Sequence, residues 1–121
     1  LLNEALLTAL AELSHANELR PIPMEISKAR SPVWFARVES DRKLTFQALA
    51  GTKQASFEFS TLTAEDHALL ARLVARYRPD NPEAQATAGI YAELTGDTTT
   101  ADEYFKNAGP EVSKQLDALF E

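Results

Sequence analysis

Apolar residues recur at helical spacing along the first part of the chain. They form one stripe between residues 2 and 19, with polar and acidic residues between them, and its members are Leu2, Leu6, Ala9, Leu10, Leu13 and Ala16. This period predicts one amphipathic helix over 2–19. Pro21 and Pro23 lack an amide donor and favour an extended conformation in the preceding residue, so 20–32 is predicted to be a connecting segment.

The period then changes to that of β-strands. Three stretches rich in aromatic and β-branched residues, 33–39, 44–50 and 55–59, are separated by the polar turns SDRK and GTKQ. Short polar connections are typical of hairpins, so the sequence predicts a three-stranded antiparallel meander. In the last stretch apolar and polar residues alternate, which predicts one buried face (Ala55, Phe57 and Phe59) and one solvent-facing side.

Helical spacing returns after residue 61. Thr63 is a predicted N-cap because Asp66 follows three residues later, as in a capping box. A stripe of apolar residues then predicts a helix that ends at Pro79, with Leu69, Leu70, Leu73, Val74 and Tyr77 on its buried side. Pro82 and Gly96 bound the next predicted helix.

Two more helices are predicted over 98–108 and 110–120. The sequence therefore predicts an α+β fold with an N-terminal helix, a three-stranded antiparallel meander and a C-terminal array of about four helices. Residues 1–121 are expected to form one domain, with a helix and linker (1–32), a small meander (33–60) and a helical part (61–121). Since residue 1 is Leu, we expect a fragment of a longer protein, or one that has lost a leader.

One stretch of the helical part has regularly spaced small and aromatic residues. The spaced positions are Gly89, the pair Gly96 and Asp97, Ala101, Phe105 and Ala108. Small residues let two antiparallel helices approach closely, and an aromatic side chain with a small residue three positions later fills the seam between them. In this pattern 82–108 resembles a tetratricopeptide repeat, which implies a helical hairpin. Departures from the repeat pattern are Gln85 and Ala92 at common aromatic positions and Ala88 at a common Leu position.

A second resemblance lies upstream. Residues 43–70 resemble the end of small SH3-like β-domains, in which a meander runs into a helix start marked here by Thr61, Leu62, Glu65 and Asp66. This resemblance implies that the last strands of the meander lead directly into the helix after residue 63.

Charge is unevenly distributed along the 121 residues, whose net charge is −6. Residues 79–121 contain nine acids and only two bases, Lys106 and Lys114. This part of the chain should repel nucleic acid and anionic membranes, and a partner that docks on it should be basic. No apolar run approaches the length of a membrane span, so we expect no membrane insertion and a soluble protein, with the cytoplasm as the favoured compartment.

No residue set in the sequence matches a catalytic or metal-binding pattern. There is no Cys, and both histidines are predicted to have surface or packing roles. His67 directly follows Glu65 and Asp66, whose side chains point in different directions. His15 has Glu12 and Glu18 at helical spacing, an arrangement that is common on solvated helices. No nucleophile elbow or phosphate-binding Gly-rich loop is present. We therefore expect no enzyme activity, no cofactor and no metal requirement.

The function predicted from the sequence is non-catalytic protein–protein interaction or scaffolding. Candidate partner-facing residues are Asp97, Asp102 and Glu103 in the acidic part of the chain, and Trp34, which is expected on the opposite side of a strand from Phe35. Two alternatives stay open: a small-ligand-binding or accessory domain of a larger enzyme, with a pocket between sheet and helices, and a structural dimerisation module. The oligomeric state and the partner are left open.

Overall fold

The computed structural model describes residues 2–16, 19–20, 22–29, 31–39 and 42–109, and it has an α+β fold. The elements run in the order helix, three strands, one 3-10 turn and three helices: α1 (Leu2–His15), β1 (Val33–Val38), β2 (Lys43–Ala48), β3 (Gln54–Glu58), η2 (Phe59–Thr61), α2 (Ala64–Tyr77), α3 (Pro82–Leu94) and α4 (Thr98–Ala108). Within this described part three α-helices follow the sheet, so about four was a slight overestimate. The further helix predicted over 110–120 lies outside the described residues.

The strands form an antiparallel meander in the order β1-β2-β3, as predicted. Phe35 of β1 lies opposite Phe46 of β2, and a register shift after Phe35 marks a bulge. Both rings are buried and meet edge to face, with centroids 6.0 Å apart. They mark the face of the sheet that belongs to the core.

The opposite face of the sheet is polar and carries Trp34. Trp34 is half-buried and pairs in register with Gln47, on the side away from Phe35. On the same face the Thr45 hydroxyl donates to Glu39 Oε1 at 3.1 Å and lies 2.8 Å from the Ser56 hydroxyl. The predicted split of Trp34 and Phe35 is therefore observed, and it is Phe35 that enters the core.

Strand β3 is less buried than its alternating pattern predicted. Ala55 is exposed, Phe57 is only partly buried, and Phe59, although buried, lies in η2 rather than in the strand. The reason is the position of β3 in the sheet. Helix α1 packs against β1, and the strand order places β3 at the other edge, where it is solvent-facing.

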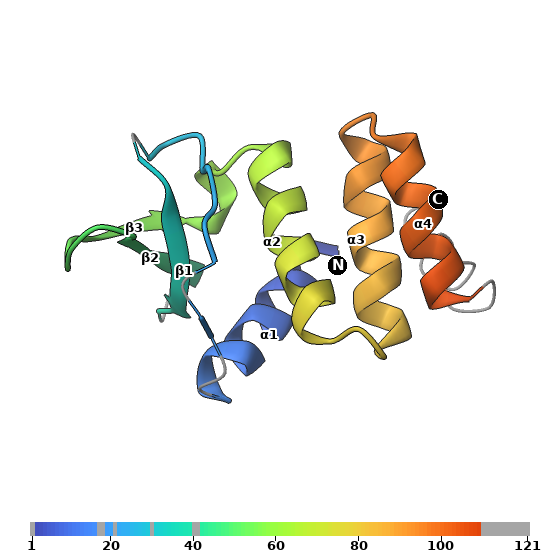
Figure 1. Cartoon of the computed structure of the whole chain (residues 1–121), viewed down its shortest axis with the longest axis horizontal. Coiled ribbons are helices and arrows are strands. Elements are labelled where there is room, and N and C mark those ends of the chain that lie inside the picture. Colours follow the sequence, from blue (N-terminus) through green and yellow to red (C-terminus); the bar gives the residue numbers. More distant parts are fainter. Residues whose placement is uncertain (1, 17–18, 21, 30, 40–41, 110–121) are drawn as a thin grey trace.

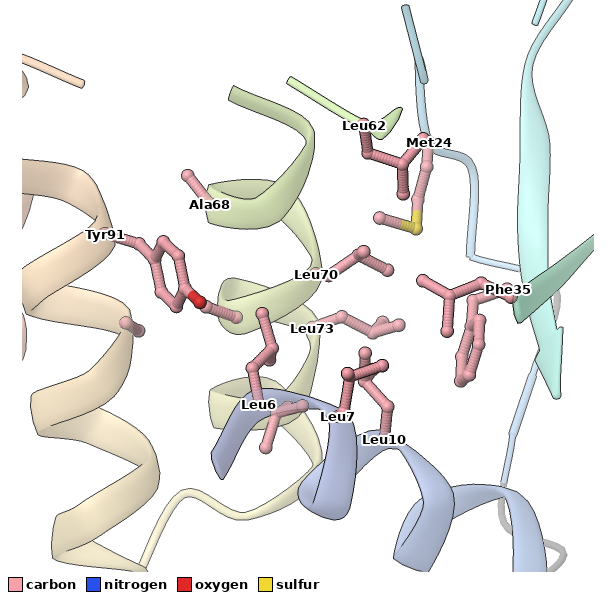
Figure 2. Packing of buried hydrophobic residues seen from close by; sticks show 14 of the residues in the cluster. Leu6, Leu7, Leu10, Met24, Phe35, Leu62, Ala68, Leu70, Leu73 and Tyr91 are labelled. Carbon is pink, nitrogen blue, oxygen red and sulfur yellow. The ribbon is translucent and has the colours of Figure 1, made fainter. Parts of the chain in front are cut away.

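Helix α2 lies at the centre of the molecule, between the sheet and the α3–α4 hairpin (Figure 1). Figure 2 shows Leu70 and Leu73 of α2 pointing toward Phe35, with Leu7 and Leu10 of α1 closing the same space from below. On the other side of α2, small Ala68 lies near Tyr91 of α3. Large side chains thus face the sheet, and a small one faces the neighbouring helix.

The segment between α1 and β1 is fixed to α2 at both ends. Near the C-terminus of α2, the Arg20 amide donates to the Tyr77 hydroxyl at 2.8 Å. Met24 pairs with Val33 as an isolated bridge. At the N-terminus of α2, Ser27 donates to Asp66 from its amide (3.0 Å) and its hydroxyl (2.6 Å). The predicted connecting segment is therefore a strap that runs the length of α2.

Asp66 also completes the capping box predicted with Thr63. Its carboxylate accepts from the Thr63 amide at 3.1 Å, and its own amide donates to the Thr63 hydroxyl at 3.1 Å. The side chain is buried, with 2% of the residue exposed. Burial by itself would raise the pKa of the carboxyl, but the hydrogen bonds from Ser27 and Thr63 outweigh it and hold the pKa below its ordinary value.

Helices α3 and α4 form a close antiparallel hairpin. A Cβ atom at Gly89 would lie 2.8 Å from Cε1 of Phe105, so the ring occupies the space that any larger residue would need. Gly96 has φ +86, a left-handed conformation that ends the turn after α3 without a Cβ clash. Ala101 and Ala108 of α4 are buried.

We predict that enlarging the Gly89 or Ala101 side chain destabilises the hairpin. Gly89→Leu and Ala101→Leu should each cost about 1–3 kcal/mol of unfolding free energy through overpacking. Gly89→Ala should fail to give the gain of about 1 kcal/mol that Ala brings to an exposed helix. In a Phe105→Ala background the same Gly89→Ala change should become stabilising. Urea unfolding of the five variants, with Phe105→Ala as the reference for the double variant, checks this. Unfolding of both Leu variants at the wild-type urea concentration would contradict it.

We also predict a pH-dependent loss for Asp66→Asn. At pH 7 the change should cost about 1–3 kcal/mol, because buried donors lose a charged acceptor. Since the folded pKa of Asp66 is lowered, its contribution is complete above the ordinary carboxyl pKa of about 4 and is lost as the pH falls through the folded value. The stability gap between wild type and variant should therefore narrow below about pH 4.

Asp97→Asn is the matched control for this measurement. Asp97 also caps a helix and also has a lowered pKa, but its carboxyl is fully exposed. Its replacement should have a smaller effect on the free energy of unfolding at every pH. Equal effects of the two substitutions would show that burial at Asp66 is not the cause.

Candidate functional site

A groove of about 300 Å³ lies between α1, the C-terminal half of α2 and the first turns of α3. We refer to it as the three-helix groove. Its floor consists of small and medium apolar side chains, namely Leu6, Ala9, Ala71, Val74 and Ala84. All except Ala9 are buried. Small residues on three different helices let the backbones approach while leaving a hollow above them.

The rim of the three-helix groove is charged. Glu12 of α1 and Glu83 of α3 are both exposed on it, and Arg78 lies at the end of α2. Arg78 Nη1 donates to the Tyr77 carbonyl at 3.1 Å, so its guanidinium is already engaged by the chain. Two exposed carboxylates against one engaged cation give the rim a net negative charge.

Local sequence fixes the loop at one end of this groove. Asn81 caps α3, its Oδ1 accepting from the amides of Glu83 (3.0 Å) and Ala84 (3.2 Å). Buried Gln85 donates from Nε2 to the carbonyls of Ala75 (3.0 Å) and Arg78 (3.3 Å) at the end of α2. These bonds hold α2 and α3 together where the groove opens. They also explain why an amide, rather than an aromatic ring, stands at residue 85.

The regularly spaced residues of 82–108 are packing residues. Gly89, Ala101 and Ala108 are buried, and partly buried Phe105 covers Gly89. Gly96 lies in the turn between the helices. The structure thus brings the predicted hairpin residues together, with the exception of Gly96, whose role is conformational.

The predicted partner-facing residues do not form one surface. Asp97, Asp102 and Glu103 are exposed at the start and along the side of α4. Trp34 lies on the sheet, at the opposite end of the molecule (Figure 1). The pKa of Asp97 is lowered by hydrogen bonds from Thr100 and, to a smaller extent, by the charge of Arg72. A single partner segment that touched both Trp34 and α4 would have to cross α2 and α3.

His67 is partly buried and belongs to a network of polar and aromatic contacts that the sequence did not reveal. Its ring stacks on Phe59 with centroids 4.0 Å apart, and Nε2 lies 2.8 Å from the Phe59 carbonyl, which can only accept. Its edge meets Tyr91, whose hydroxyl donates to Asn3 Oδ1 at 2.5 Å. Burial raises the pKa of the Tyr91 phenol. These contacts link α1, α2 and α3, and they give His67 a packing role.

The remaining candidates among the described residues are His15 and possible clusters of metal ligands. His15 is exposed at the end of α1. No group of three or more His, Asp or Glu side chains in that part of the chain could hold a metal ion. No described helix combines the length and apolar character needed to cross a membrane.

Comparisons with protein-family models, with curated proteins and with solved structures found no match to this chain. The three-helix groove is the candidate site that the geometry of the described residues supports. It offers an apolar floor open to solvent, bounded by carboxylates.

Proposed function

We propose that the chain is a non-catalytic protein-binding domain that holds a basic, partly apolar peptide segment in the three-helix groove. The observation that carries this proposal is the combination of an apolar floor with two exposed carboxylates, Glu12 and Glu83, on its rim. Protein interfaces have the same arrangement, in which an apolar centre is surrounded by a polar margin. An apolar side chain of the partner would enter the hollow, and its basic residues would face the rim.

The size and openness of the groove favour a peptide over a small ligand. Small-ligand pockets measure about 300–1,000 Å³ and bury most of the ligand surface. The three-helix groove is at the lower end of that range, about 300 Å³, and several of its lining side chains are exposed, including Ala5 and Thr8. A peptide needs to bury only one or two side chains in such a groove.

Charge and sequence resemblance add support to this proposal. Glu83 belongs to residues 79–121, where acids outnumber bases by nine to two. A negative field of this kind steers a basic partner toward the domain and raises its association rate. The resemblance of 82–108 to a tetratricopeptide repeat also favours a scaffolding role over a catalytic one.

The test is selection of peptides from a random library on the wild-type domain, followed by binding kinetics. We expect enrichment of Lys and Arg around an apolar residue. Glu12→Gln with Glu83→Gln should weaken the selected peptide by about tenfold, equivalent to about 1.4 kcal/mol. Thr87→Trp, which fills the groove from α3, should abolish binding. Glu58→Gln with Glu65→Gln changes the same charge at exposed positions outside the groove and is the control.

Salt dependence gives an independent readout. Raising ionic strength from about 0.01 M to 0.15 M shortens the screening length from about 30 Å to about 8 Å. The association rate should fall well before the dissociation rate rises. An association rate that does not respond to salt, or equal affinity for the Glu12/Glu83 variant, would reject the proposal. Binding of small compounds that Thr87→Trp blocks would favour the ligand-binding alternative, and dimerisation blocked by it would favour the structural one.

A further inference from the structure

A second groove, of about 390 Å³, lies on the other side of α2 and has the opposite charge. We refer to it as the arginine groove. It is formed by residues 22–24 of the strap, by α2 and by Tyr104 of α4. Its α2 residues are Leu69, Arg72, Leu73 and Arg76, whereas Ala71, Val74 and Arg78 line the three-helix groove. At 3.6 residues per turn these two sets point to opposite sides of the helix.

Arg72 and Arg76 give this groove a concentrated positive charge. Both are exposed and lie one helical turn apart on the same side of α2. Among the described residues neither guanidinium has a hydrogen bond or an ion pair within 4.0 Å. Like charges at this spacing repel each other. Arg76 lies in the last turn, where a cation favours the helix, but Arg72 lies one turn earlier and lacks this effect.

Among the described acids, Asp97 forms no ion pair with Arg72 or Arg76. The charge of Arg72 contributes to the lowered pKa of Asp97. The Asp97 carboxylate, however, caps α4 and accepts a hydrogen bond from the Thr100 amide at 3.2 Å. Arg76 has no comparable neighbour among the described acids. An incoming carboxylate can therefore bind both arginines without displacing an existing ion pair.

The walls between the arginines are apolar. Ile22, Leu69 and Tyr104 are each partly buried and line the groove from three different elements. Tyr and Arg are the residue types that contribute most to binding energy at protein interfaces. Arginine also binds carboxylates through two parallel hydrogen bonds, which gives direction as well as charge.

We propose that the arginine groove binds an acidic peptide segment of a second partner. Two carboxylates of the segment face Arg72 and Arg76, and an apolar side chain between them packs against Ile22, Leu69 and Tyr104. Within the lining of the groove the charge comes from these two side chains, while the chain as a whole carries −6. A long polyanion such as nucleic acid or an anionic membrane is repelled by the remainder of the surface, whereas a short acidic segment is not.

The inference goes beyond the proposed function and does not depend on it. With both grooves occupied, the domain joins a basic segment on one side of α2 to an acidic segment on the other. Each groove can be tested alone, because their lining residues do not overlap.

The experiment uses a short fluorescein-labelled peptide in which Glu and Leu alternate, with a Lys–Leu peptide of the same length for comparison. Fluorescence anisotropy gives the affinity, and amide shifts in nitrogen–proton correlation spectra give the location. We expect shifts at Leu69 and Tyr104, and about a tenfold loss of affinity in Arg72→Gln with Arg76→Gln. Lys43→Gln with Lys53→Gln makes the same charge change on the exposed sheet and should leave affinity unchanged.

A conservative variant separates direct contact from loss of folding. Arg72→Lys with Arg76→Lys keeps the charge and loses the paired hydrogen bonds, so its affinity should lie between wild type and the Gln variant. Unchanged affinity of the Glu–Leu peptide in the Gln variant would overturn the proposal, as would shifts confined to the three-helix groove, or tighter binding of the Lys–Leu peptide with its shifts at Leu69 and Tyr104. Arginine-dependent binding to phosphatidylserine vesicles without peptide binding, or arginine-dependent dimerisation, would also overturn it and assign the surface to a membrane or to a second copy.

Discussion

Helix α2 must be buried on two opposite sides at once, and most other features of the structure follow from this requirement. Leu70 and Leu73 fill the space toward the sheet and α1, while Ala68 leaves room for Tyr91 of α3. A helix buried in this way cannot shift along its axis without disturbing both neighbours. Its first turn is fixed by the Thr63–Asp66 capping box, and the strap fixes it at both ends through Ser27 and Tyr77.

The two grooves occupy the remaining sides of this helix. Elements that pack on opposite sides of one helix leave two strips of its surface between them, and the side chains on these strips are only partly covered. On one such strip the chain places small residues and carboxylates, and on the other it places two arginines and a tyrosine. One rigid helix thus presents two surfaces of opposite charge at a fixed separation.

Local sequence patterns predicted the helices and strands, but they could not predict contacts between residues far apart in the sequence. Three features depend on residues that are close in sequence or strictly spaced: the capping box of Thr63 and Asp66, the meander, and the Gly89–Phe105 contact. Burial of β3 was overestimated because alternation reveals an apolar face but not whether another element covers it. The grooves combine residues from all four α-helices and the strap, and no period in the sequence links Glu12 to Glu83 or Ile22 to Tyr104.

The hydrogen bond between Asn3 and Tyr91 joins residues 88 positions apart. At synthesis rates of roughly 5–20 residues per second, α1 leaves the ribosome about 4–18 s before its partner on α3 exists. The meander and the α3–α4 hairpin contain only local contacts and can form as they emerge. During that interval α1 can pack against β1 and then against α2 as each emerges, and only its contact with α3 must wait. The packing of α1 is therefore completed in stages, and its contact with Tyr91 forms only after α3 has been made.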